Sequence, residues 1–158
     1  MKAISKINNT LAKIEGAVMV FWFAIVLVVM TCQVVSRYIF NAPIAWSEEF
    51  ARYSFVWISY IGCAYCVSVD AHTGITAFRD ALPPKAKKLT TVLGNVVVMI
   101  VFIRLLPIAM KFIGKNSKFL TSMMRIPFKY LYYSLPVGCV LTVVHLILKS
   151  ILLFAPDT

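Results

Sequence analysis

Four stretches of roughly 20 residues each carry almost no charged side chain. An apolar run at residues 18–30 lies within an uncharged segment from Gly16 to Ser36, and three further segments share this pattern. A helix of about 20 residues rises about 30 Å, which is the thickness of the hydrocarbon layer of a bilayer. The runs are continuously apolar and lack the alternation of a membrane β-strand. The pattern therefore predicts an all-α integral membrane protein with four transmembrane helices, at about residues 14–37, 46–69, 88–110 and 129–152.

The first of these segments follows a basic N-terminal flank, as the apolar part of a cleavable secretion signal would. It is too long for such a signal, and no small-residue cleavage motif follows Met30. We expect the segment to be retained, so that residues 1–158 form a single four-helix membrane domain.

The second and third connecting segments have the pattern of short amphipathic helices at the membrane surface. After Asp70, three apolar residues fall on one helical face before a proline pair: Ile75, Phe78 and Leu82. In the third segment, lysines share one face beside apolar neighbours: Lys111, Lys115 and Lys118. Lysines that extend from a helix end toward water account for this basic face without a partner, and a docking surface is the alternative.

Composition supports a membrane protein and excludes other classes. Hydrophobic residues make up 61% of the chain and charged residues 14%, against roughly 45–50% and about 25% in soluble domains. These values exclude a soluble fold, and the aromatic content excludes a disordered chain. The net charge of +10 favours contact with membrane lipids, and we expect no nucleic-acid partner. Because basic residues are divided almost evenly between the two sides, only the basic N-terminal flank favours cytoplasmic termini.

The cysteine and histidine residues offer little for catalysis. Cys63 and Cys66 form a C-x-x-C pair, but they lie inside the second span, where burial disfavours a reactive thiolate. Arg104 and His145 are the ionisable residues expected deepest in the spans, and we expect no acidic partner for them there, since all six acids flank the spans or lie in loops. We therefore predict no catalytic residue, metal site or cofactor. Two alternatives remain, a four-helix membrane thiol oxidoreductase and the membrane anchor of a respiratory complex.

The start of the second span is the densest polar cluster. Ser47 has the properties of an N-cap, and Glu48 and Glu49 follow in the first turn, where the helix dipole favours negative charge. Glu48 and Arg52 are spaced i, i+4 in the favourable order, and Trp46 suits the headgroup level. Two adjacent acids cannot share one basic partner on the same face. Glu49 is therefore expected to take an Arg or Lys from another helix or another chain.

Residues around this cluster resemble a family signature. The ordered set consists of Arg37-Tyr38-Ile39-Phe40-Asn41, the run from Trp46 to Tyr53, then Trp57, Gly62 and His72. It is similar to the small membrane subunit of tripartite ATP-independent periplasmic (TRAP) transporters. The similarity is close over about residues 30–85 and extends to the whole chain in length and helix layout.

The resemblance implies a bacterial or archaeal inner-membrane protein with both termini in the cytoplasm. Small subunits of this family pair with a large multi-helix subunit that binds substrate and sodium, and with a soluble periplasmic binding protein. Their substrates are small organic acids such as C4-dicarboxylates and sialic acids. The implied function is that of a non-catalytic scaffold that does not itself bind the substrate.

Contacts with these partners are expected on residues of the first and third connecting segments, which would then lie at the periplasmic side, and on His72 of the second connecting segment. The candidates come from the polar cluster, its surroundings and the basic third segment: Arg37, Trp46, Glu48, Glu49, Arg52, His72, Lys115 and Lys118. The cluster would fix the small subunit against the large one or shape the surface that receives the binding protein. The two lysines would contact acidic residues of the binding protein.

Overall fold

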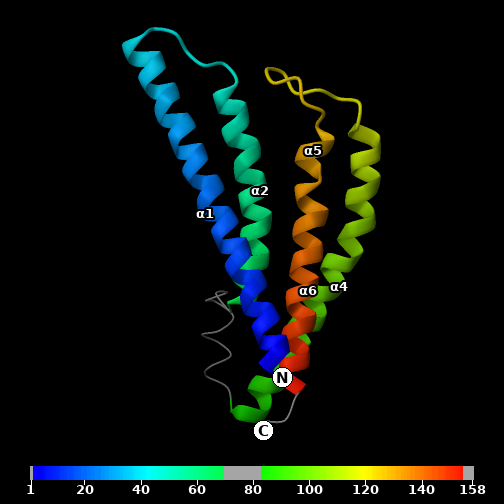
Figure 1. Ribbon diagram of the computed structural model, residues 1–158. Helices are drawn as coiled ribbons and strands as arrows, with labels where there is room; N and C mark the ends of the chain where they lie inside the picture. The colour runs from blue at the N-terminus through cyan, green and yellow to red at the C-terminus, as the bar shows by residue number, and fades with distance from the viewer. Residues whose placement is uncertain (1, 70–82, 155–158) are drawn as a thin grey trace.

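The computed structural model describes residues 2–69 and 83–154, and nearly all of these are helical (Figure 1). The elements are α1 (Lys2–Ile39), α2 (Ser47–Ser68), α4 (Pro84–Asn116), α5 (Lys129–Tyr132) and α6 (Ser134–Phe154). Only Tyr133 separates α5 from α6, so the two helices follow one another along a single direction. The all-α class predicted from the apolar runs is therefore confirmed.

Two of the helices are longer than the uncharged runs suggested. α1 begins at Lys2, and α4 extends from Pro84 to Asn116. Lysine and glutamate are good helix formers, so a charged side chain ends the apolar run without ending the helix. Pro84 stands in the first turn of α4, where a missing backbone N–H costs nothing.

Three segments are long and apolar enough to cross a membrane: Ile4–Ile39, Leu89–Asn116 and Lys129–Leu152. These three confirm three of the four expected spans by length and composition. α2 is long enough to cross but is not among these three segments, because Glu48, Glu49 and Arg52 lie in its first turns and serines and tyrosines interrupt its apolar residues.

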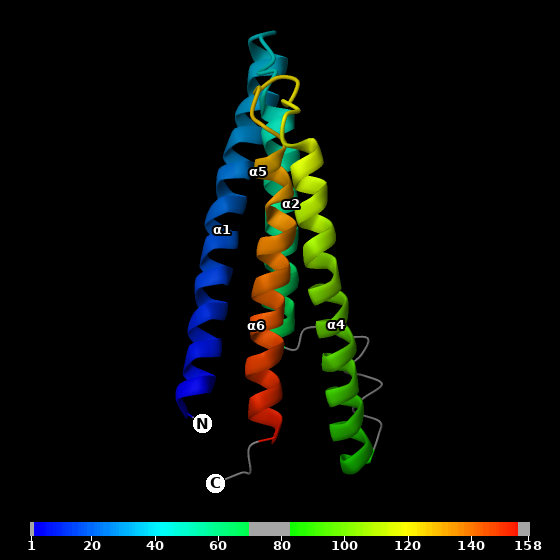
Figure 2. The ribbon, with the colours of Figure 1, turned by 90° about the vertical axis from the view of Figure 1, so that its right-hand side faces the viewer.

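The helices pack in the order α1, α2, α6, α4. α2 and α6 lie in the middle, and α1 touches α6 less extensively. Within the described residues, α1 and α4 do not contact each other, so the arrangement is an open row and not a closed bundle. The start of α1 and the end of α6 lie at one end of the molecule (Figures 1 and 2), and in the view of Figure 1 the two helical hairpins diverge toward the other end.

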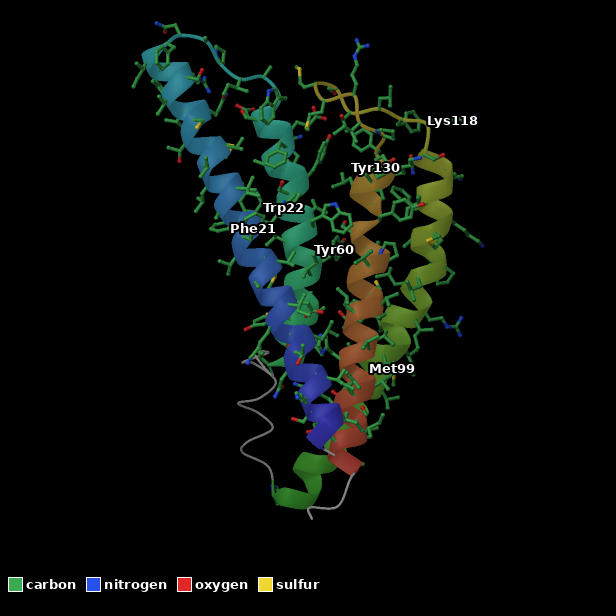
Figure 3. The ribbon with its side chains drawn as sticks, viewed as in Figure 1. Phe21, Trp22, Tyr60, Met99, Lys118 and Tyr130 are labelled. Carbon is green, nitrogen blue, oxygen red and sulfur yellow. The ribbon has the colours of Figure 1, made fainter. Side chains whose placement is uncertain are left out.

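The central contact between α2 and α6 depends on a glycine. An added β-carbon at Gly138 of α6 would lie 2.8 Å from Tyr60 Cβ and 2.9 Å from the Tyr60 carbonyl oxygen, so the two backbones approach closely only because Gly138 has no side chain. Tyr60 lies on α2 beside α6 (Figure 3). Small residues allow this kind of close helix packing in membranes.

The outer helices carry large apolar side chains that the chain itself leaves uncovered. Phe21 on α1 is 68% exposed, and Ile108 on α4 is 62% exposed. Buried apolar residues are mostly small and lie where helices meet, as Ala64 and Cys139 do. Lipid or another protein must therefore cover the outer faces of α1 and α4.

The third loop, defined here as residues 117–128, is not the amphipathic helix that the sequence pattern predicted. It folds back on itself through a β-bridge between Leu120 and Pro127, and Arg125 has a left-handed backbone with φ of 52°. α4 ends at Asn116, where the Asn116 side-chain amide donates a 2.9 Å hydrogen bond to the Phe112 carbonyl and the Ser117 hydroxyl donates one of 3.0 Å to the Gly114 carbonyl. The similar helix expected in the second connecting segment falls outside the described residues.

Candidate subunit interface and buried polar clusters

The start of α2 differs from the expected cap. Trp46 occupies the N-cap position, and no side chain caps the helix there. Ser47 is buried, and its hydroxyl donates a 2.7 Å hydrogen bond to the carbonyl of Ile44 in the preceding turn. The prediction of Ser47 as the N-cap was therefore wrong. The hydroxyl satisfies a carbonyl of the incoming loop instead of a helix N–H.

Glu49 joins α2 to the tip of the third loop. Its Oε2 atom accepts hydrogen bonds from the backbone N–H groups of Met123, at 2.8 Å, and Met124, at 3.0 Å. The Tyr53 hydroxyl donates to Oε1 at 2.7 Å. The carboxylate is buried. Bonds of this kind to a carboxylate are about twice as strong as neutral ones, so they offset the loss of water around the charge.

The prediction that an arginine or lysine pairs with Glu49 was therefore wrong for the described residues of this chain. Glu49 did need a partner beyond its own helix turn, as predicted, but backbone N–H groups of a distant loop supply it. Glu48 remains exposed, and no ion pair joins it to Arg52 within residues 2–69 and 83–154. The favourable spacing of these two side chains does not produce a contact, because both extend toward solvent.

The connection between α1 and α2 is fixed by a residue that the sequence reasoning missed. The buried Gln33 side chain accepts a 2.6 Å hydrogen bond from the backbone N–H of Ile44. Asn41 takes a left-handed backbone with φ of 51°, which asparagine tolerates better than most residues. A buried amide inside an apolar helix is the signal that could have found Gln33.

The other interface candidates gather at the same end of the molecule. Arg37 is in the last turn of α1, with its guanidinium 5.9 Å from the Tyr38 ring. Trp46 is 45% exposed and packs edge-on against Phe50. Lys115 is in the last turn of α4, and Lys118 follows in the third loop (Figure 3). His72 lies outside the described residues.

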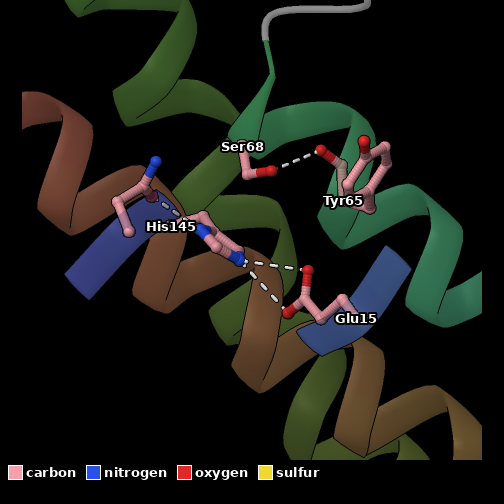
Figure 4. A network of polar contacts seen from close by, with 5 residues as sticks. Glu15, Tyr65, Ser68 and His145 are labelled. Carbon is pink, nitrogen blue, oxygen red and sulfur yellow. Dashed lines mark hydrogen bonds and ion pairs between the residues drawn. The ribbon is translucent and has the colours of Figure 1, made fainter. Parts of the chain in front are cut away.

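A second polar cluster joins α1 to α6 nearer the opposite end (Figure 4). His145 Nδ1 lies 2.7 Å from Asn8 Oδ1, and Nε2 lies 3.1 Å from Glu15 Oε1. All three side chains are buried. Lys149, one turn further along α6, donates a 2.6 Å hydrogen bond to the carbonyl of Val67 in α2.

The expectation that His145 has no acidic partner was therefore wrong. α1 continues as a helix through Glu15 and crosses α6 at this level, so the glutamate lies inside the helical assembly and not at its edge. Asn8 and Glu15 are seven residues apart, which places them on one helical face. That spacing was the available signal.

The described cysteines and the other metal-ligating side chains were the candidates for redox or metal chemistry. Cys63 and Cys66 are free thiols within α2, half-buried. No group of three His, Cys, Asp or Glu side chains among the described residues is placed to hold a metal ion.

Comparison with known sequences gives a consistent set of relatives. Residues 16–155 match the family described as "Tripartite ATP-independent periplasmic transporters, DctQ component". The chain is 32% identical over 143 residues to the sialic acid TRAP transporter small permease protein SiaQ of Vibrio cholerae, covering 90% of this chain and 81% of that protein. It is 26% identical over 141 residues to the sialic acid TRAP transporter permease protein SiaT of Haemophilus influenzae, covering 89% of this chain and 22% of that longer protein.

A third relative carries a different substrate in its name. The C4-dicarboxylate TRAP transporter small permease protein DctQ of Vibrio cholerae is 25% identical over 85 residues, covering 54% of this chain and 37% of that protein. The family match spans nearly the whole chain, and it confirms the resemblance seen around α2. The chain therefore belongs to the DctQ family of small permease subunits of TRAP transporters, which are transport components and not enzymes.

Proposed function

We propose that this small permease subunit serves a sodium-coupled transporter of small organic acids, such as sialic acid or a C4-dicarboxylate, and is the scaffold of its large subunit. The open row of helices carries the proposal. Uncovered apolar faces on α1 and α4 suit a subunit that packs against another membrane protein. The SiaT relative also supports it, since a segment similar to this chain forms 22% of that longer permease.

The proposed setting is the bacterial inner membrane, with four spans and both termini in the cytoplasm. α2 would be the fourth span, because its 22 residues are long enough to cross the bilayer and it packs beside both α1 and α6. The start of α1 and the end of α6 share one end, as an even number of spans requires. The third loop and the start of α2 would then face the periplasm.

The large subunit should be recovered with the small one from native membranes. We expect affinity purification of this chain in mild detergent to yield a polytopic partner in about equal amount. The Glu48→Ala, Glu49→Ala double variant tests whether the acidic start of α2 contributes to that association. Normal complex yield together with normal uptake in this variant would contradict the role proposed for the cluster.

The third loop is proposed to receive the periplasmic binding protein. Lys115 and Lys118 are exposed near the end of α4, and we expect them to attract acidic residues of that partner. The Lys115→Glu, Lys118→Glu variant should need about tenfold more binding protein for half-maximal uptake at low salt. The difference should shrink at about 0.5 M salt, where screening is strong. The matching glutamine variant should have a smaller effect, and unchanged uptake in both would exclude this docking surface.

The C-x-x-C pair is expected to have no part in transport. The Cys63→Ala, Cys66→Ala variant should import substrate at the wild-type rate, because we expect both thiols of α2 to act only as small apolar packing groups. Uptake into proteoliposomes with and without a thiol-alkylating reagent measures this. Loss of uptake at normal complex yield would instead favour thiol chemistry.

A further inference from the structure

The carboxylate of Glu49 contacts the tip of the third loop and the base of α2 together. Its Oε2 accepts two successive backbone N–H groups, from Met123 and Met124, while Oε1 accepts the hydroxyl of Tyr53 on its own helix. The tip is 74 residues away from Glu49 along the chain. One buried side chain therefore sets where the tip lies relative to α2.

The loop has internal hydrogen bonds in addition to its contacts with Glu49, which include the Thr121 side chain as well as the two backbone N–H groups. Thr121 N–H donates to the Ile126 carbonyl at 2.9 Å, and Ile126 N–H donates to the Thr121 hydroxyl at 3.0 Å. Phe128 N–H donates to the Phe119 carbonyl at 2.9 Å. These bonds close the base of the loop on itself. Loss of the Glu49 carboxylate would release the loop tip from α2, while the two backbone bonds, Thr121 to Ile126 and Phe128 to Phe119, would still close the turn.

The loop also lines a half-open cavity at the end where the two hairpins diverge. The cavity has a volume of about 200 Å³, and Trp22 of α1, Trp57 of α2 and Met124 of the loop are among its lining residues. Phe128 packs edge-on against Tyr53, with ring centroids 6.1 Å apart. The Glu49 bonds and this ring contact connect the first hairpin to the loop at the diverging end.

The outward side of the loop is basic and apolar. Residues 117–128 contain Lys118 and Arg125 and no acidic residue. Both basic side chains are exposed, as are Phe119 and Met123, the latter at 61%. A fixed surface of this composition complements an acidic protein surface with apolar patches. A soluble partner can bind it without paying for loop ordering at that moment.

We propose that Glu49 is a positioning residue that holds the third loop against α2, so that the loop tip forms a preformed docking surface for an acidic face of the periplasmic binding protein. The inference rests on the proposed docking function and adds the residue that controls it. Glu49 acts through the loop backbone and does not itself contact the partner, because its carboxylate is buried.

The first test measures the loop in the purified small subunit alone, in lipid nanodiscs. Trypsin cleaves after exposed Lys and Arg in mobile backbone, so the rate of cleavage after Arg125 reports loop release. Glu49→Ala should raise that rate about tenfold, since both backbone N–H groups lose their acceptor. Glu48→Gln is the matched control on the same helix turn and should leave the rate unchanged. An unchanged rate in Glu49→Ala would overturn the proposal.

The second test measures docking in the reconstituted transporter. Import of labelled sialic acid or succinate, whichever the wild type transports, is followed against the concentration of binding protein. Glu49→Ala should raise the half-saturating concentration about tenfold while the maximal rate stays near wild type. A merely structural defect would lower the maximal rate and leave the half-saturating concentration unchanged, which would overturn the proposal.

The two proposals fail in different ways. If reversal of Lys115 and Lys118 weakens docking but Glu49→Ala does not, the loop docks without needing Glu49, and only the positioning role is wrong. If Glu49→Ala frees the loop and neither variant changes the half-saturating concentration, the third loop is not the docking surface. Glu49→Gln, which keeps one acceptor oxygen, should fall between wild type and Glu49→Ala in both measurements.

Discussion

Replacement of Gly138 by alanine is expected to lower the thermal stability of the purified subunit substantially. The new β-carbon would stand 2.8 Å from Tyr60 Cβ and 2.9 Å from the Tyr60 carbonyl oxygen. The nearest atoms include backbone, which cannot rotate away as a side-chain tip can, so α2 and α6 must separate. Overpacking of this kind costs about 1–3 kcal/mol. Because α2 and α6 form the central contact of the row, every other helix should be affected.

Two glycines of α4 provide matched controls. A β-carbon at Gly94 or Gly114 would meet no atom within 4 Å. Alanine at these positions should leave stability unchanged or raise it by about 0.5–1 kcal/mol, since glycine is a poor helix residue. The measurement is the fraction of monodisperse subunit that survives heating in detergent. If Gly138→Ala behaves like Gly114→Ala, the close approach of α2 and α6 is wrong.

Removal of either member of the His145–Glu15 pair should be the second large effect. Glu15→Leu leaves His145 Nε2 without its acceptor, and His145→Leu leaves a carboxylate buried without its donor. Breaking a buried pair costs about 3–5 kcal/mol in soluble proteins, while hydrogen bonds between membrane helices average about 0.6 kcal/mol. Because Glu15 and His145 are both buried, we expect a loss of about 3 kcal/mol, at the lower end of the range for buried pairs in soluble proteins.

The double variant separates the pair from its surroundings. Glu15→Leu combined with His145→Leu removes both polar groups, so it should recover much of the stability lost in either single variant. Asn8→Ala should cost only about 1 kcal/mol, because it removes one hydrogen bond between His145 Nδ1 and an uncharged amide. The contact of His145 Nε2 with Glu15 stays in place. The same heating assay measures all four variants. Additive losses in the double variant would show that the two side chains do not interact.

Helix formation and lipid burial are local properties, and the apolar runs therefore predicted the helices well. The limits of α1 and α4 were misjudged because a charge such as Lys13 ends an apolar run while the helix continues. Tyrosines and serines also interrupt the apolar residues of α2, and a count of charges ignores them.

Contacts between distant segments were harder to predict. The pattern around Glu49 correctly indicated that this acid needs a partner beyond its own turn, but side-chain patterns do not record backbone N–H groups such as those of Met123 and Met124. The spacing of Asn8 and Glu15 did mark a polar face of α1. The partner of that polar face, His145, depends on how α1 packs against α6. The sequence pattern of one helix does not contain this information.

The open row of helices has a consequence for the way the subunit sits in a bilayer. A closed bundle of four helices has a nearly round cross-section and tilts with equal ease in every direction. A chain in which α1 and α4 stand at opposite ends, out of contact, has an elongated cross-section with one long axis. A row of helices with this shape tilts less readily along its long axis than across it. A neighbouring subunit bound along this axis, as in the proposed scaffold role, would share that resistance to tilting.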